Sequence, residues 1–275
     1  MKRVAAIQMA SGPNLSANLN EAGRLISYAV DSGADLVVLP ENFVLMGMEQ
    51  TDFVKIKEPQ GVGPIHEFLI SMCTKHRVWI VSGTIPIEID DPDRIRAACL
   101  LMNPEGEIVS RYDKIHLFDV VLDDGERYAE SDIMEAGKDI VVQDTPFGRI
   151  GFAICYDLRF PEMFRRMLDH GVDLIVVPSA FTAMTGKAHW ETLVRARAIE
   201  NLCYVITSAQ GGYHANGRET HGDSMIVDPW GEITDRLPGG SGFVIADLDL
   251  EKVKRIRKQF PALEHRKLEC YKKSP

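Results

Sequence analysis

The chain has 275 residues, of which 45% are hydrophobic and 26% are charged, a composition typical of a globular protein with a sizeable core. Its formal net charge of -9 argues against nucleic acid or an anionic membrane surface as a partner. No apolar run reaches the ~18 residues that a membrane span needs.

Five cysteines are scattered along the chain, and none belongs to a CxxC pair. This usage favours a reducing compartment over a disulfide framework. The first residues are basic and then apolar, but Gln8, Ser11 and Asn14 make the apolar run too short for a signal peptide. We therefore expect a cytoplasmic protein.

The first half of the chain predicts strands that alternate with helices. Residues 4–9 are expected to form a strand, and Ser16 to cap a helix that runs to Asp31 with one apolar face. The continuous apolar run 36–39 is typical of a strand covered on both faces, and it ends at Pro40. Further elements are expected at 64–76 (helix), 78–84 (strand), and 97–102 with 107–112 (a hairpin).

The second half begins with a long segment, residues 115–137, that shows no clear period. Loops of this length inside a compact domain are usually functional. The elements expected after it are strands at 140–143, 149–154 and 174–177, a helix from Pro161, a helix at 187–201, strands at 204–209, 225–228 and 243–247, and a charged helix at 250–260.

An internal repeat bears on the architecture. Residues 31–40 and 169–178 share one pattern: the end of a helix, a glycine, a buried strand and a proline. Two copies of one helix-to-strand unit predict two similar half-sheets stacked face to face, with helices outside. We therefore expect an α/β fold of four layers, an αββα sandwich, in a single domain over residues 1–275.

Three reactive side chains follow predicted strands. Glu41, Lys114 and Cys155 come after residues 36–40, 108–112 and 150–154. If these strands share a sheet edge, the three side chains meet at their carboxyl ends, where open α/β sheets bind ligands. Taken singly, each residue has an ordinary interpretation: a solvated carboxylate, an exposed lysine and an inert buried cysteine.

Together these residues suit nucleophilic catalysis. The helix that follows Cys155 is expected to lower the thiol pKa and to receive an oxyanion at its N-terminus. Glu41 can take the thiol proton, while Lys114 and the backbone N–H of Tyr156 can stabilise the oxyanion. Attack on an amide carbonyl would give a thioester and release ammonia, and water would then hydrolyse the thioester.

Three segments carry a family resemblance. In chain order they read Leu-Pro-Glu41-Asn-Phe, Tyr-Asp-Lys114-Ile-His-Leu-Phe-Asp and Cys155-Tyr-Asp-Leu-Arg-Phe-Pro-Glu, and they resemble the nitrilase superfamily of carbon–nitrogen hydrolases. Segments 185–191, 195–201 and 228–231 resemble its Nit branch. The resemblance implies the αββα fold and a triad at Glu41, Lys114 and Cys155. It also implies a second glutamate, Glu130, that positions Lys114 and the attacking water.

The resemblance further implies an amidase that acts on the carboxamide of a small α-keto-acid-type substrate such as deaminated glutathione. The alternative is an ω-amidase that acts on α-ketoglutaramate, and nitrile hydrolysis ranks below both. Arg159 can bind a substrate carboxylate in bidentate fashion, or it can instead pair with Glu162 or Asp157.

Aromatic side chains are expected to wall the pocket, namely Phe43 and Phe181 together with Tyr156. One departure from related Nit sequences is Asp223, which stands where they usually have histidine. It lies away from the triad motifs, so it leaves the substrate detail open.

The histidines offer an alternative site chemistry. A Cys–His triad could use His116, yet no histidine is bracketed by a motif that would orient it. His214 and His221 lack a paired ligand cluster, so we expect no metal, and the family implies no cofactor. The alternative outside the enzymes is a non-catalytic scaffold or interaction protein on the same fold. Such a protein would need none of the four catalytic candidates, Glu41, Lys114, Glu130 and Cys155. The resemblance also implies a homodimer, with residues 250–275 as a C-terminal extension in its contacts.

Overall fold

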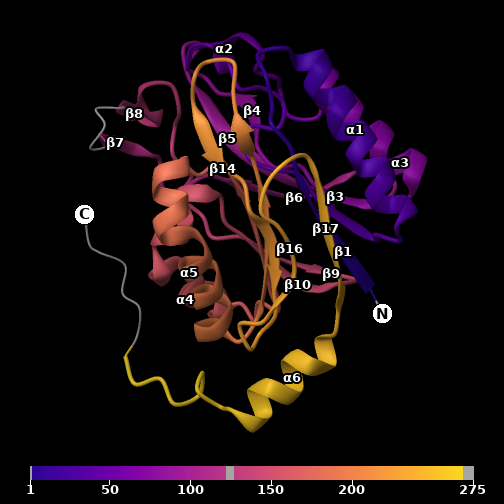
Figure 1. The fold of residues 1–275 in the computed structure, drawn as a ribbon, viewed down its shortest axis with the longest axis vertical. Coiled ribbons are helices and arrows are strands. Elements are labelled where there is room, and N and C mark those ends of the chain that lie inside the picture. The colour runs from indigo at the N-terminus through magenta and orange to yellow at the C-terminus, as the bar shows by residue number, and fades with distance from the viewer. Residues whose placement is uncertain (1, 122–126, 269–275) are drawn as a thin grey trace.

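A computed structural model describes residues 2–121 and 127–268 of the chain. Two β-sheets pack face to face, and helices cover the outer face of each (Figure 1). This is the predicted four-layer αββα arrangement, so the predicted fold class is confirmed.

The first sheet has the strand order β17-β1-β2-β3-β5-β4, with β6 beside β5. Its strands are β1 (Lys2–Gln8), β2 (Leu36–Val38), β3 (Trp79–Val81), β4 (Ile85–Glu88), β5 (Ile95–Met102), β6 (Ile108–Asp113) and β17 (Gly242–Leu248). The second sheet has the order β16-β15-β12-β11-β10-β9. Its strands are β9 (Val142–Thr145), β10 (Gly148–Phe152), β11 (Leu174–Ser179), β12 (Tyr204–Ala209), β15 (Ser224–Val227) and β16 (Ile233–Leu237).

The helices are α1 (Leu15–Asp31), α2 (Asp52–Lys55), α3 (Pro64–His76), α4 (Pro161–Asp169), α5 (Ala183–Asn201) and α6 (Leu250–Gln259). Two short 3-10 helices are η1 (Glu130–Asp132) and η2 (Cys155–Arg159). Two small hairpins pair β7 (Asp119–Val121) with β8 (Arg127–Ala129) and β13 (Gly211–Tyr213) with β14 (Glu219–His221).

Strand alternation places the core on both faces of the first sheet. Ala5 and Ile7 of β1 pack with buried residues of α1 and α3, whereas Val4 and Ala6 join the cluster that includes the second sheet. Successive side chains of a strand point to opposite faces, so one short apolar run serves both layers. The continuous apolar runs of β1, β2 and β11 are explained by this double coverage.

The internal repeat is built with the same contacts in each sheet. The N–H of Asp35 donates to the Arg3 carbonyl at 2.8 Å, and the N–H of Asp173 donates to the Arg149 carbonyl at 2.9 Å. In return the Arg3 N–H donates to Asp35 at 2.9 Å and the Arg149 N–H to Asp173 at 3.1 Å. The two copies are therefore one helix-to-strand unit, used once in each sheet.

The boundaries differ from the predicted ones at several points. The N-cap of α1 is Asn14 rather than Ser16, because the extended Asn14 accepts a hydrogen bond from the Ala17 N–H at 2.9 Å. The segment 115–137 contains β7, β8 and η1, and the sequence did not predict β4, β13, β14 or β16.

The predicted C-terminal extension, residues 250–275, begins with α6, while residues 269–275 lie outside the described residues. No helix in the described part of the chain is long and apolar enough to cross a membrane.

Gly83 lies against the segment that leads to Glu41. It has φ +67°, and a Cβ there would lie 2.1 Å from the Pro40 carbonyl oxygen. Gly83→Ala is therefore expected to lower the free energy of unfolding by about 2–4 kcal/mol, through backbone strain and overpacking, as measured by urea denaturation. Gly239→Ala is the control, because a Cβ there meets nothing within 4 Å. Equal effects of the two substitutions would contradict this account.

Candidate active site

The three predicted reactive residues meet in one place, but their strands do not share one sheet. Glu41 follows β2 and Lys114 follows β6, both in the first sheet, whereas Cys155 follows β10 in the second. The expectation of a common sheet edge is therefore wrong. The site forms because the two stacked sheets end together, and each contributes part of it.

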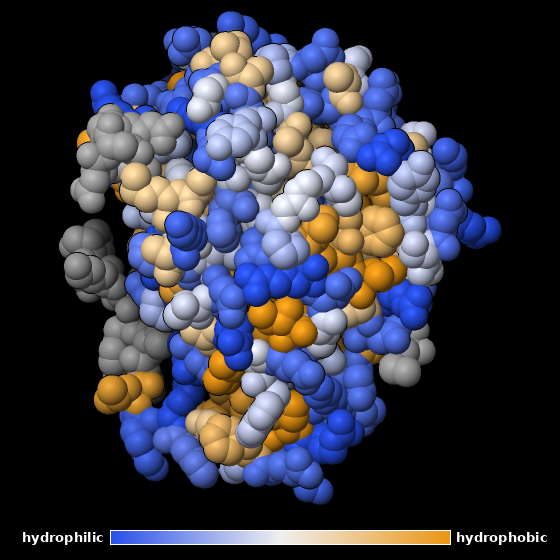
Figure 2. All heavy atoms as spheres, in the orientation of Figure 1, coloured by the Kyte–Doolittle hydropathy of each residue, from blue (hydrophilic) through white to orange (hydrophobic). Residues whose placement is uncertain are grey.

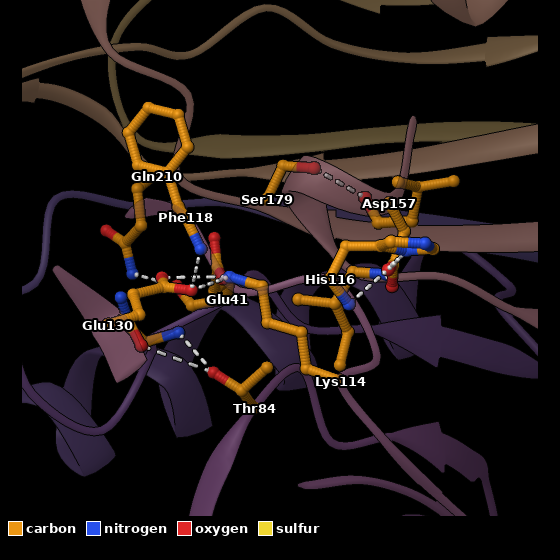
Figure 3. A network of polar contacts seen from close by, with 12 residues as sticks. Glu41, Thr84, Lys114, His116, Phe118, Glu130, Asp157, Ser179 and Gln210 are labelled. Carbon is orange, nitrogen blue, oxygen red and sulfur yellow. Dashed lines mark hydrogen bonds and ion pairs between the residues drawn. The ribbon is translucent and has the colours of Figure 1, made fainter. Parts of the chain in front are cut away.

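Lys114 is the centre of a buried ion cluster (Figure 3). Its Nζ lies 2.8 Å from Glu41 Oε1 and 2.8 Å from Glu130 Oε2. Lys114 is 1% exposed and Glu41 4%, so these two charges have little access to water, while Glu130 is partly buried. Buried charges are tolerated only when paired and hydrogen-bonded, which these contacts provide.

Cys155 occupies a strained turn between strand and helix. Ile154 is extended, Cys155 has φ +46°, and η2 begins at Cys155 itself. A non-glycine residue in the left-handed region costs on the order of 1–3 kcal/mol. The sharp turn lets the thiol line the same cavity as Glu41.

The thiol pKa is shifted in the direction opposite to the one expected. Burial and the negative charge of Glu41 raise the pKa of Cys155 well above its ordinary value, and Lys114 only partly offsets them. Glu41, Glu130 and Lys114 already carry a formal charge of -1 together, two carboxylates against one ammonium. A thiolate would add a second negative charge, so the resting group is a thiol.

The partners of that thiol are correspondingly perturbed. Burial raises the pKa of Glu41, with Glu130 acting in the same direction and Lys114 opposing it. Burial alone would lower the pKa of Lys114, but the carboxylates of Glu130 and Glu41 hold it well above its ordinary value. Lys114 is therefore a permanent cation, and Glu41 is a carboxylate of raised basicity that contacts the thiol.

Glu130 joins the long segment to this cluster. Its carboxylate accepts hydrogen bonds from Lys114 Nζ at 2.8 and 2.9 Å and from the Phe118 N–H at 2.8 Å. Gly137, farther along the same segment, donates its N–H to the Lys114 carbonyl at 2.8 Å. A Cβ at Gly137 would lie 2.1 Å from the Asp113 carbonyl oxygen, so only glycine fits there.

The backbone on either side of the cluster is held by buried amide contacts. Gln210 donates to the Glu41 carbonyl at 3.0 Å, and Thr84 accepts from the Asn42 N–H at 2.8 Å (Figure 3). Gln210 comes from the end of the second sheet, so it connects that sheet to the loop that carries Glu41.

Asp157 is a functional candidate that the sequence reasoning missed. It is fully buried and accepts from Tyr112 Oη at 2.7 Å, from the Ile154 N–H at 2.8 Å, and from the N–H and ring of His116 at 3.1 and 2.6 Å (Figure 3). One carboxylate thus joins Tyr112 and His116, two residues before and two residues after Lys114, to the turn of Cys155. Asp157 lies within the recognised motif, but its partners are visible only in three dimensions.

A cavity that is partly open to solvent lies over Cys155. Two of the predicted wall residues, Tyr156 and Phe181, line it, and so does Arg159, the predicted carboxylate-binding residue. The Arg159 guanidinium lies 5.0 Å from the centre of the Phe181 ring and 3.1 Å from His189 Nδ1. Among the described residues Arg159 has no ion pair with Glu162 or Asp157, the alternative left open by the sequence.

Phe43 is the exception among the predicted pocket residues. It is fully buried in the core beneath α1 and α3, with its ring centre 6.4 Å from that of Phe68, and it does not line the cavity. Residues at i and i+2 after a strand need not face the same side, so its nearness to Glu41 in the chain was misleading. Phe118 lines the cavity in its place, and the centre of its ring lies 5.0 Å from the centre of the Tyr156 ring.

Asp223 does not line the cavity, whereas Arg218, which the sequence did not predict, does. Asp223 is buried and paired with Arg236 at 2.6 and 2.8 Å, outside the cavity lining. Arg218 lines the cavity, and no motif in the sequence pointed to it.

The histidines that were weighed as ligands have other partners. His214 contacts the Ser11 carbonyl and Thr220, and His221 lies 3.7 Å from Asp223. Within residues 2–121 and 127–268 there is no group of three or more His, Cys, Asp or Glu side chains that could hold a metal ion.

Comparison with known proteins places this geometry in a family. The family described as carbon-nitrogen hydrolase matches residues 3–258. The chain belongs to the carbon–nitrogen hydrolase family. It is 44% identical to a deaminated glutathione amidase of Synechocystis, over 95% of this chain and 97% of that protein. The predicted family and its hydrolase class are therefore confirmed.

Solved structures of the family agree. The nitrilase and fragile histidine triad fusion protein NitFhit of Caenorhabditis elegans superposes with a TM-score of 0.90 at 35% identity, over 96% of this chain and 65% of that one. Nit3 of Saccharomyces cerevisiae, described as a member of branch 10 of the nitrilase superfamily, superposes with a TM-score of 0.85 at 31% identity, over 94% of each chain.

Asp157→Ala tests the connection between the two loops. It leaves the Tyr112 hydroxyl, the Ile154 N–H and the His116 N–H without their buried acceptor, so we expect the free energy of unfolding to fall by about 2–5 kcal/mol in urea denaturation. Asp144→Ala is the control, because it removes only an exposed pair with Arg149 and should change stability by under ~0.5 kcal/mol. A comparable loss in both variants would count against the role of Asp157.

Proposed function

We propose that the protein hydrolyses the amide bond of deaminated glutathione, or of a close relative with a 2-oxo acid acyl group, through a thioester on Cys155. The observation that carries this proposal is that the Cys155 thiol and the Glu41 carboxylate line one cavity, while Glu41 pairs with the Lys114 ammonium at 2.8 Å. The name of the Synechocystis relative supports the substrate. No cofactor or metal is needed, because these side chains supply the base, the nucleophile and the positive charge.

In the first half-reaction Cys155 attacks the amide carbonyl. Glu41 takes the thiol proton as the sulfur–carbon bond forms, and the carbonyl oxygen becomes an oxyanion stabilised by Lys114 and the backbone N–H of Tyr156. Glu41 then gives that proton to the leaving nitrogen as the carbon–nitrogen bond breaks. The amine or ammonia departs and leaves a thioester.

In the second half-reaction water attacks the thioester. Glu41, again a carboxylate, accepts a proton from the water, and Glu130 positions both Lys114 and the water. When the tetrahedral intermediate collapses, the sulfur leaves and is reprotonated by Glu41. The acid product departs and the thiol is restored, so the proton balance closes.

Arg159 is proposed to bind the carboxylate of the 2-oxo acid. Its guanidinium lies over Phe181 on the wall of the cavity, and a guanidinium can hold a carboxylate through two parallel hydrogen bonds. Such a contact would place the distal amide of the acyl chain at Cys155. An ω-amidase acting on α-ketoglutaramate would use the same contact, so it remains the second candidate.

The assembly and location are proposed on separate grounds. Trp230 and Phe260 are 61% and 52% exposed with ring centres 5.8 Å apart, and apolar residues also gather near α6 on the face seen in Figure 2. This exposed apolar surface supports a homodimer through the C-terminal segment.

The described cysteines are all free, which supports a cytoplasmic location.

Substitution of the triad tests the activity directly. Cys155→Ala should abolish release of product from deaminated glutathione, and Glu41→Gln should lower kcat/KM by about 10²–10⁴-fold, because it removes the base. Glu105→Gln, in an exposed turn, is the matched control and should stay within about twofold of the wild type. Equal rates for wild type and Cys155→Ala would favour the non-catalytic scaffold.

The pH dependence follows from the pKa of Glu41. The residue must be ionised to accept the thiol proton, and burial raises its pKa, so activity is present above that pKa and is lost as the pH falls through it. The acid limb of the kcat/KM profile should therefore lie at a higher pH than the ~4.3 of an ordinary glutamate. A profile that stays flat to below that pH would show that Glu41 is not the base.

A further inference from the structure

Arg218 is a second guanidinium in the catalytic cavity, and the mechanism above does not use it. It precedes β14 on the hairpin β13–β14, just after Gly217, whose φ of +84° makes the turn. The guanidinium lies 4.6 Å from the centre of the Tyr128 ring. Among the described residues no carboxylate forms an ion pair with Arg218, although the chain carries an excess of acidic groups.

Arg159 and Arg218 are held in the same way at different places. Each lies over an aromatic ring, Phe181 for Arg159 and Tyr128 for Arg218. A ring face contacts the plane of the guanidinium and leaves its N–H edge able to bind an anion. Both arginines therefore present N–H groups to one cavity, and they come from different elements, η2 for Arg159 and the β13–β14 hairpin for Arg218.

The two positions differ in what lies beyond them. Arg218 also lines two neighbouring hollows. One is formed with residues 46–50 together with Asn42, Phe53 and Asn216, and the other with residues 48–51 together with Arg127, Ala129, Asp132 and Ile133. Arg159 lines only the catalytic cavity among these three. Arg218 thus borders the catalytic cavity and both hollows, and the hollows give room for a substrate group that extends past it.

We propose that Arg218 binds a carboxylate on the amine leaving group of the substrate and so selects amides of amino acids or short peptides over primary amides. The inference rests on the proposed function, since it assigns Arg159 to the acyl carboxylate and leaves Arg218 for the other end. A primary amide releases ammonia and has no group to reach Arg218. A peptide amide carries a terminal carboxylate that suits a second guanidinium.

Glu219, the residue after Arg218, limits which substrate groups can bind beside Arg218. It also lines the cavity and is exposed, so its carboxylate repels any anion that does not reach the Arg218 N–H edge. Glu219 therefore serves as the matched control for a charge change on the same rim.

The test compares three substrates that share a 2-oxoglutaryl group. They are α-ketoglutaramate, the amide formed with cysteinylglycine, and the same amide with its terminal carboxylate converted to a carboxamide. The ratio of kcat/KM for the carboxylate-ended substrate to kcat/KM for the carboxamide-ended one should fall about 10–100-fold in Arg218→Gln, which is the loss of one charge-assisted pair. Arg159→Gln should lower kcat/KM for all three substrates, and Glu219→Gln should not lower the ratio.

The outcomes are distinct. An unchanged ratio in Arg218→Gln, or an equal fall in Glu219→Gln, would overturn the inference, and thermal melting would show whether each variant is folded.

Binding of the two dipeptide amides to the Cys155→Ala enzyme, measured by calorimetry, makes the same comparison without turnover. Failure of the wild type to hydrolyse any of the three would contradict the proposed function, while the binding ratio would still decide the role of Arg218.

Discussion

The buried contact of one ammonium with two carboxylates is the constraint on which the site depends. Lys114 is almost inaccessible to water, and its charge is balanced by Glu41 and Glu130 at 2.8 Å. Removing Lys114 would leave two neighbouring carboxylates without their cation, which is costly in the interior. The cluster therefore fixes where Glu41 lies, and with it the position of the base that faces the nucleophile.

The rest of the fold serves to bring a sulfur to that base. Two sheets end at one place, and Cys155 enters from the second sheet in a strained turn. Asp157 stabilises that turn and, through Tyr112 and His116, connects it to the loop that carries Lys114. Strain at one residue is thus offset by a buried network, which is common where geometry must be kept for chemistry.

Much of this could be predicted from the sequence, because local patterns determine local structure. The apolar runs 36–39 and 174–177 correspond to β2 and β11, and the repeat around them gave the stacked half-sheets. The motif residues Glu41, Lys114 and Cys155 are close together as expected. Nearness in the chain predicted the pocket lining less well, because Phe43 lies in the core although Glu41, two residues before it, lies in the site.

The parts that could not be predicted are those that depend on distant segments. The role of Asp157 arises from partners up to 45 residues away, and Arg218 lines the cavity because its hairpin pairs with the segment of Phe181 and Thr182. The direction of the Cys155 pKa shift was also missed. A helix N-terminus favours a thiolate, but burial and the neighbouring Glu41 have the larger effect here.

The protonation state of Cys155 therefore tests the account most directly. Thiolate absorbance in the ultraviolet, recorded across pH for the wild type minus the Cys155→Ala enzyme, reports that one sulfur. The account predicts no thiolate at pH 7 and a transition only above the ~8.5 of an ordinary cysteine. A thiolate already present at pH 7 would show that the proton does not rest on the sulfur, and Glu41 would then have no proton to take.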